Sequence, residues 1–356
     1  MTDPTLADHA AAPDHSRQRY DFREHLGSGG MADVYRARDT ELGRDVAVKV
    51  FRATDDTVAD LQRREREIRL LSRLNHPGLV DIHDAGTLLH DGQARRYVVM
   101  EYIEGRSLAH RLARGPMTAR QVADVGAQIA DALSYVHGHS IVHRDVKPEN
   151  ILVADVPTLG YTVMAKLADF GVAQFIDGSR LTSDGAIMGT AAYLSPEQAR
   201  GEEIGTSSDV YSLGLVLLEA LRGEREYTGS AIEAALARLH RPPHIPEDLP
   251  EQWQSLLAAM TSSDPAVRPT AHDVAATMRD IIRGMIISGR GKHEGRRARP
   301  SSVRSVRSVR SVRRVGRASE ADSPRGRGAV VVGAAILGLA AAITAVVGIV
   351  AGVVAI

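Results

Sequence analysis

IVHRDVKPEN, from Ile141 to Asn150, and LADFG, from Leu167 to Gly171, decide how the fold of this 356-residue chain is interpreted. Ahead of them, DVAVKVF (Asp45–Phe51) and RRYVVMEYI (Arg95–Ile103) are β-rich runs bounded by Gly, Asp and polar turns, as is typical of strands. From about Ser107 onward the spacing of apolar residues becomes helical. The pattern predicts a small β-rich lobe followed by a larger helical lobe.

Helix signals mark the second lobe. Thr118 and Gln121 form a capping box ahead of an apolar face. The run SSDVYSLGLVLLEALRG (Ser207–Gly223) is strongly apolar and ends in glycine, so we expect a buried helix there. Thr270 is expected to cap a last helix. In the first lobe, residues 59–75 combine many charges with apolar residues at helical spacing and predict an amphipathic helix.

The two opening stretches, with LGSGGMADVY (Leu26–Tyr35) and VAVK (Val46–Lys49), resemble the catalytic core of the eukaryotic-type Ser/Thr protein kinases. Within that family the chain is similar to the bacterial, membrane-anchored branch. The likeness extends from about Tyr20 to Ile282. It implies an α+β, two-lobed protein kinase fold, and the apolar C-terminal residues predict one transmembrane helix in addition.

The glycine-rich stretch suits phosphate binding, because residues without a Cβ let backbone N–H groups approach phosphates closely. The family places a third glycine where this chain has Ala32, a small departure. The resemblance implies that ATP is bound by Leu26, Gly27, Ser28, Gly29, Gly30, Met31, Ala32, Val34, Ala47, Lys49, Glu101 and Ile103.

Lys49 is implied to contact the α- and β-phosphates and to pair with a helical carboxylate. Glu67 has the family's spacing to the Asn-His-Pro turn, and Glu65 is the alternative partner. The chain contains only four lysines among 44 basic residues. Two of them, Lys49 and Lys147, fall where the family uses a compact, strongly hydrated charge that a guanidinium does not mimic.

The resemblance assigns the chemistry of phosphoryl transfer to the opening stretches. Asp145 is the expected base toward the substrate hydroxyl, and Lys147 is expected to neutralise charge on the γ-phosphoryl group. Asn150 and Asp169 supply the hard oxygens that Mg²⁺ prefers, and Mn²⁺ could take its place. The expected activity is that of a non-specific serine/threonine protein kinase. The alternative is a nucleotide-binding pseudokinase scaffold, against which the intact catalytic residues argue.

The segment from Asp169 to Glu197 matches the family's activation loop. Thr182 and Ser183 are the expected phosphoacceptors, and Asp184 stands where related kinases often carry a second one. Thr190 is expected to orient the substrate hydroxyl. Arg144 stands directly before Asp145. An arginine at this position is typical of the family's kinases that need an anion on the activation loop to organise the site.

Three further residues have scaffold roles by resemblance. Glu197 is expected to pair with Arg268, and Asp209 is expected to hold the backbone of the catalytic loop.

The C-terminal end predicts a membrane anchor. Residues 329–356 contain no charge, and a spanning helix needs roughly 20 apolar residues. Residues 289–328 carry 12 Arg and one Lys against three acidic residues, a net charge of +10, which is the positive-inside signature. We expect a single-pass protein of the cell membrane with a cytoplasmic kinase domain and its C-terminus at or just beyond the outer face.

The repeat SVRSVRSVRSVRR (Ser302–Arg314) is interpreted as a strip facing anionic lipid headgroups. No aromatic residue is interleaved with its arginines, so no nucleic-acid partner is expected. Its serines at 302, 305, 308 and 311 are hypothesised to be autophosphorylation sites that weaken membrane contact. The GxxxG spacing at Gly348–Gly352 is compatible with helix dimerisation, although such spacing arises easily in an Ala/Gly-rich segment. The family's dimers imply a homodimer as a further expectation.

The sequence thus predicts protein substrates, signal transduction and four regions. They are a flexible leader (1–19), a kinase domain (20–285, with an N-lobe of about 20–103 and a C-lobe of about 104–285), a basic juxtamembrane linker (286–328) and a transmembrane helix (329–356). The chain has no cysteine, so it offers neither a disulfide nor a thiolate site.

Overall fold

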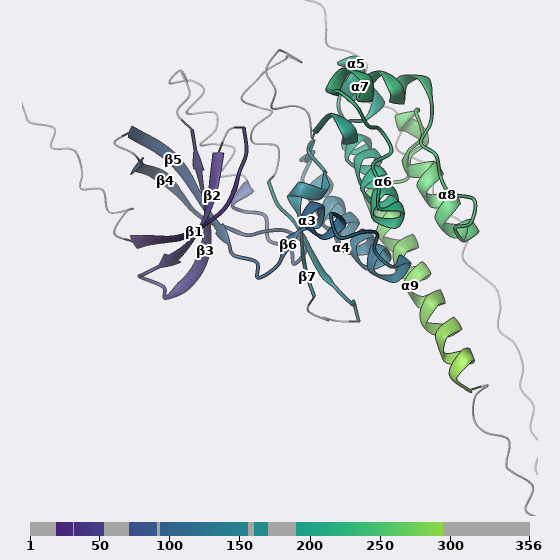
Figure 1. The fold of residues 1–356 in the computed structure, drawn as a ribbon, viewed down its shortest axis with the longest axis horizontal. Coiled ribbons are helices and arrows are strands. Elements are labelled where there is room, and N and C mark those ends of the chain that lie inside the picture. The colour runs from purple at the N-terminus through teal and green to yellow at the C-terminus, as the bar shows by residue number, and fades with distance from the viewer. Residues whose placement is uncertain are drawn as a thin grey trace, which may run out of the picture. The chain divides into compact units, whose positions relative to one another are not determined.

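The computed structural model describes residues 19–30, 32–52, 71–90, 93–155, 160–169 and 190–294. Within these ranges it contains a five-stranded antiparallel sheet, a three-stranded antiparallel sheet and a group of helices. Figure 1 shows the five strands gathered together, with the helices from α3 onward following them. The predicted two-lobed arrangement, β-rich first and helical second, is confirmed.

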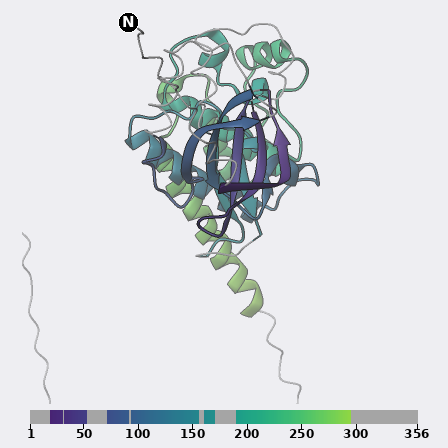
Figure 2. The same cartoon turned by 90° about the vertical axis from the view of Figure 1, so that its left-hand side faces the viewer.

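The N-terminal sheet has the strand order β1-β2-β3-β5-β4. Apolar residues alternate along its central strand, and Val46, Val48 and Val50 are buried with Tyr20, Leu88 and Tyr97. Figure 2 shows this sheet from its own side, in front of the helices. Its strands are β1 (Tyr20–Ser28), β2 (Ala32–Asp39), β3 (Arg44–Phe51), β4 (Ile82–His90) and β5 (Gln93–Glu101).

The C-terminal lobe opens with a short sheet in the order β6-β7-β8. This sheet carries the catalytic segments, because the first of them precedes β7 and the second follows β8. Its strands are β6 (Arg106–Ser107), β7 (Ile151–Ala154) and β8 (Met164–Leu167). The helices are α3 (Leu108–Leu112), α4 (Ala119–Gly138), α5 (Pro196–Arg200), α6 (Thr206–Arg222), α7 (Ala231–His240), α8 (Glu251–Met260) and α9 (Ala271–Glu294), with 3₁₀ turns η1 (Pro148–Asn150), η2 (Thr190–Tyr193) and η3 (Pro265–Val267).

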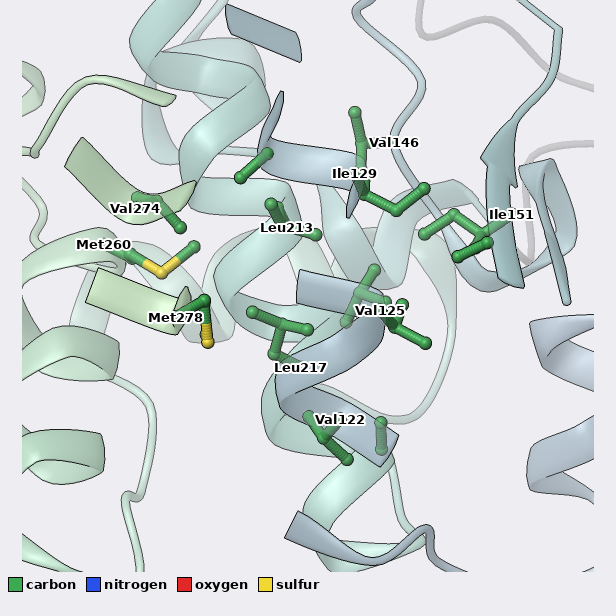
Figure 3. Close-up of a cluster of buried hydrophobic side chains, with 14 of the residues drawn as sticks. Val122, Val125, Ile129, Val146, Ile151, Leu213, Leu217, Met260, Val274 and Met278 are labelled. Atoms are coloured by element: carbon green, nitrogen blue, oxygen red, sulfur yellow. The ribbon is translucent and has the colours of Figure 1, made fainter. Parts of the chain in front are cut away.

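The core of this lobe is formed between α4, α6, α8 and α9. Figure 3 shows side chains of these helices converging, among them Val125 and Ile129 of α4, Leu217 of α6 and Met278 of α9. Helix α6 is apolar nearly all round and is buried from Ser208 to Ala220, as its sequence predicts. Because α4 and α6 are fixed in this core, the loop that follows α4 is held against α6.

The predicted helix starts are confirmed. The Thr118–Gln121 capping box is present at α4, and Thr270 Oγ1 accepts a hydrogen bond from the Asp273 N–H at the start of α9 (3.2 Å). These caps satisfy backbone donors that a helix leaves open at its first turn. The helix predicted for residues 59–75 lies almost wholly outside the described residues.

None of the helices that the structure describes is both long enough and apolar enough to cross a bilayer. The predicted transmembrane segment, 329–356, and the Ser-Val-Arg repeat lie outside the described residues, as does the leader up to residue 18. Helix α9 continues to Glu294, into the segment predicted as a linker.

Candidate active site

The glycine-rich stretch forms a hairpin between β1 and β2. The Gly29 N–H donates to the carbonyl of Ala32 (2.8 Å) and closes the turn, and Gly27 lies opposite Val34 in the ladder. Ala32 is buried, is paired with Phe51 of β3 and has no positive φ. An alanine fits there without backbone strain, so the departure from the family's glycine pattern leaves the hairpin intact.

The adjacent strands place the other expected ATP-binding residues. Val34 on β2 is the ladder partner of Lys49 on β3, and Ala47, two residues earlier on the same strand, is buried. Glu101 ends β5, and Ile103 follows it with a buried side chain. Leu26 is exposed near the end of β1. Met31 lies outside the described residues.

Asp145, Lys147 and Asn150 are brought together in the loop between α4 and β7. The Lys147 ammonium lies 2.8 Å from Asp145 Oδ2. The Asn150 amide Nδ2 donates to Asp145 Oδ2 (3.0 Å) and to the Asp145 carbonyl (2.8 Å). A lysine and an asparagine thus contact the same carboxylate oxygen of Asp145 and fix the orientation of its side chain.

The backbone of this loop is held by a buried carboxylate of α6. Asp209 accepts hydrogen bonds from the N–H groups of His143 (2.8 Å) and Arg144 (2.7 Å), and it also contacts the His137 ring (2.8 Å). Arg144 has a positive φ of 68°. Such a conformation costs roughly 1–3 kcal/mol in a residue other than glycine and persists where neighbours impose it.

His143 joins the two catalytic stretches. Its ring is buried, and burial lowers its pKa, so the ring is neutral near pH 7. Nδ1 accepts the Asp145 N–H (3.4 Å), while Nε2 lies 3.1 Å from the Ala168 carbonyl. Since an N–H can only donate and a carbonyl only accept, the proton sits on Nε2. This one tautomer ties the loop carrying Asp145 to the residue before Asp169.

Lys49 and Asp169 form an ion pair between the two lobes. The Lys49 Nζ lies 2.7 Å from Asp169 Oδ1. Asp169 has a φ of 54°, so both Arg144 and Asp169, each beside or within a catalytic motif, adopt left-handed backbone. The sequence assigned Lys49 a helical glutamate as partner. Glu67 and Glu65 lie outside the described residues.

A second interlobe ion pair was missed by sequence reasoning. Lys166 on β8 donates to both carboxylate oxygens of Glu101 (2.9 and 2.6 Å). Beside it, the Val80 N–H donates to the Leu167 carbonyl (3.0 Å). The only available signal was that one of four lysines stands three residues before Asp169.

Behind the catalytic loop, Glu197 and Arg268 form a buried two-pronged ion pair. Nη1 lies 2.7 Å from Oε1 and Nη2 2.9 Å from Oε2, and Ser208 also donates to Glu197 (2.6 Å). Burial by itself would raise the pKa of Glu197. The hydrogen bonds from Arg268 and Ser208 outweigh it and lower the pKa to about 2.

Arg238 of α7 was also missed. Its side chain is buried and donates to the carbonyls of Ala191, Leu194 and Ala234. The backbone that leads into α5 is therefore held by a buried guanidinium.

Thr182, Ser183 and Asp184 lie outside the described residues. Thr190 begins the 3₁₀ turn η2, and the structure describes its backbone only.

The residues present fit ATP and Mg²⁺. Within the described part of the chain, the buried Oδ1 of Asp145 has no hydrogen-bond partner, whereas Oδ2 has two. A buried carboxylate oxygen without a hydrogen-bond donor lowers the stability of the fold unless a ligand or a cation contacts it. Asn150 and Asp169 offer an amide oxygen and a carboxylate for a hard cation, and Lys49 offers a cation for phosphates.

Comparison with protein families decides the identity of this site. A model of the protein kinase domain matches residues 20–278, well over half of the chain. This chain belongs to the protein kinase family. The chain is 40% identical over 282 residues to the serine/threonine-protein kinase PknB of Mycobacterium tuberculosis, and equally to PknB of Mycobacterium bovis.

It is 38% identical over 268 residues to the serine/threonine-protein kinase PknA of M. tuberculosis. These alignments take in 76% and 72% of the kinase, but only 44% of PknB and 61% of PknA. The resemblance to bacterial Ser/Thr kinases that the motifs indicate is thus confirmed.

Proposed function

We propose that this protein is a serine/threonine protein kinase that transfers the γ-phosphoryl group of ATP to hydroxyl groups of proteins. One observation carries the proposal: Asp145 shares one carboxylate oxygen with Lys147 and Asn150 while its other oxygen has no partner among the described residues. That arrangement leaves one carboxylate oxygen available to accept the proton of a substrate hydroxyl. The similarity to PknB and PknA supports Ser and Thr as the acceptors.

In the proposed reaction, the hydroxyl oxygen of the substrate forms a bond to the γ-phosphorus. The bond from that phosphorus to the β,γ-bridging oxygen breaks, and ADP leaves with the electron pair. The hydroxyl proton passes to Oδ1 of Asp145. Lys147 stabilises the negative charge of the transferring group, and Lys49 binds the phosphates that stay behind. Mg²⁺, held by Asn150 and Asp169, would supply further charge neutralisation.

The nucleotide-binding scaffold remains less well supported. Such a protein needs no catalytic base. In this chain, however, His143 and Asn150 bond Asp145, and Asp209 bonds the His143 backbone, so the position of Asp145 is closely fixed. Ala32, the one departure in the glycine-rich hairpin, sits in unstrained backbone.

For regulation, we propose autophosphorylation of Thr182 or Ser183. The support is Arg144, a cation directly before Asp145 in a backbone conformation that must be imposed from outside. Dimerisation of the kinase is a further proposal, supported by the GxxxG spacing and the resemblance alone.

The catalytic proposal is tested with the full chain in detergent micelles, incubated with γ-labelled ATP and Mg²⁺. We expect label on serine and threonine, with Thr182 or Ser183 among the sites located by mass spectrometry. The Asp145→Asn variant should lose roughly two orders of magnitude or more of this rate, since general-base catalysis contributes about 10²–10⁴-fold. Asp155→Asn, an exposed residue after β7, is the matched control and should behave as wild type. Bound ATP without transfer in wild type would favour the scaffold.

We also propose that residues 329–356 span a membrane, with the kinase domain on the cytoplasmic side and the basic strip against anionic lipid. The support is the uncharged apolar length and the adjacent charge of +10. The full chain should stay with the membrane pellet after a high-salt wash, because salt screens charges but not apolar burial.

Replacing the arginines at 304, 307, 310 and 313 with glutamine should leave the pellet unchanged. Release of wild type by salt alone would mean that the strip, not a span, makes the attachment.

A further inference from the structure

Gln198, at the third position of α5, makes two hydrogen bonds of opposite kind. Its Oε1 accepts the Ser195 N–H (2.8 Å), which closes a capping box at the start of the helix. Its Nε2 donates to the carbonyl of Arg144 (3.1 Å), 54 positions away in the sequence. Because an N–H can only donate and a carbonyl only accept, both ends of the carboxamide are specified. A capping glutamine is therefore also a contact to the catalytic loop.

The carbonyl that Gln198 contacts belongs to the peptide unit leading into Asp145. The opposite edge of that same unit is the Asp145 N–H, which donates to Nδ1 of His143 (3.4 Å). One side of the peptide plane is thus held by α5 and the other by the neutral histidine. The rotation of this plane sets the direction in which the Cα–Cβ bond of Asp145 leaves the backbone.

The backbone conformation of Arg144 makes these hydrogen bonds to the next peptide unit necessary. Arg144 adopts left-handed backbone, which its neighbours must impose. Asp209 holds the N–H on the near side of Arg144 (2.7 Å), and Gln198 holds the carbonyl on the far side. Without Gln198, the Arg144 N–H stays bonded to Asp209, and the peptide plane leading into Asp145 loses its hydrogen bond to α5 and keeps the longer one to His143 (3.4 Å).

We propose that Gln198 is a positioning residue that fixes the direction of the Asp145 carboxylate. The inference rests on the proposed function, in which Asp145 is the catalytic base. It also couples two parts of the site. Just ahead of α5, the carbonyls of Ala191 and Leu194 accept hydrogen bonds from Arg238 of α7. The position of that backbone therefore affects Asp145 through Gln198.

The chain supplies a matched control. Gln121 occupies the equivalent third position of a capping box in α4, and its Oε1 accepts the Thr118 N–H (3.2 Å). It lies 16 residues before His137, about 24 Å along the helix from the end that meets Asp209. At α7 the same position is naturally a glutamate, Glu233, so a carboxylate can close such a cap.

Two pairs of variants of the full chain separate capping from positioning. Gln198→Glu and Gln121→Glu keep the cap acceptor and lose the amide donor. Gln198→Met and Gln121→Met lose both without adding charge. We expect both variants at 198 to lower kcat about 10-fold or more, because small misplacements of a catalytic group are costly, with KM for ATP within about twofold. Both variants at 121 should keep wild-type kcat, while each methionine variant lowers the melting temperature by a similar amount.

Hydrogen–deuterium exchange gives a readout that does not depend on activity. Peptides covering residues 141–150 should exchange faster in Gln198→Met than in wild type or Gln121→Met. A wild-type kcat in either variant at position 198 would overturn the inference. If Gln198→Met keeps the wild-type kcat and Gln198→Glu does not, the loss in Gln198→Glu comes from the added charge. If wild type itself transfers no phosphoryl group, the proposed function fails instead, and unchanged exchange at 141–150 would then refute the positioning role.

Discussion

An Asp169→Asn variant is expected to lose phosphoryl transfer on the order of 10³-fold, the scale of removing one strong electrostatic contact from a charged transition state. The substitution keeps the size of the side chain and removes its charge. Asp169 is the partner of Lys49 across the two lobes (2.7 Å) and one of two groups suited to Mg²⁺. Its loss should therefore weaken the proposed Mg²⁺ binding and remove the ion pair with Lys49.

The measurement is the transfer rate of the full chain at saturating ATP over a Mg²⁺ titration. The apparent Mg²⁺ requirement should rise in Asp169→Asn as the rate falls. Asp248→Asn, an exposed aspartate ahead of α8, controls for the loss of one negative charge. A rate within tenfold of wild type at all Mg²⁺ concentrations would remove Asp169 from the metal site.

An Arg268→Ala variant is expected to lower the free energy of unfolding by about 3–5 kcal/mol, since it leaves the buried Glu197 carboxylate without its cation. The guanidinium makes two contacts with Glu197 and also bonds the Ser207 and Ser262 carbonyls. Denaturant unfolding at pH 7 measures the loss. Arg283→Ala removes a solvent-exposed pair with Asp280 on α9 and should cost less than about 1 kcal/mol.

The contribution of Glu197 depends on pH with a definite sign. Its pKa is about 2 in the folded protein, against 4.5 as its ordinary value. A carboxyl with a lowered folded pKa stabilises the fold fully above the unfolded pKa and loses that contribution as pH falls through the folded one. The difference between wild type and Arg268→Ala should therefore be largest above pH 4.5 and shrink below it. A difference that grows in acid would contradict the ion pair.

Sequence patterns within a few residues of one another were sufficient to predict the fold. Alternating valines in β3, the capping box at Thr118 and the apolar run of α6 each report on neighbours within a few positions, and these elements appear where they were predicted. The motifs likewise selected Asp145, Lys147 and Asn150, which the structure brings together.

Contacts between distant segments could not be predicted in this way. Lys166 with Glu101 and Gln198 with Arg144 join positions 65 and 54 apart, and neither pair has a spacing that a helix or strand would reveal. Gln198 was concealed further because it already satisfies a local rule as a capping residue. Arg238 is a basic residue on a helix, a pattern that usually indicates exposure, yet its guanidinium is buried against backbone carbonyls.

Helix α9 changes from buried to exposed side chains before Ile287. Among the side chains of α9 that the structure describes, which end at Ile287, Ile282 is the last buried one and Met285 the last that packs on the core. Ile286 and Ile287 are exposed, and the helix continues to Glu294. At 1.5 Å per residue, the turns from Ile286 onward add about 13 Å of length. Because Ile286 and Ile287 are exposed, substitutions at these two positions should leave the packing of the catalytic lobe unchanged. The surface of α9 at Ile286 and Ile287 is therefore open to sequence change, whereas the buried positions up to Ile282 are constrained by the core.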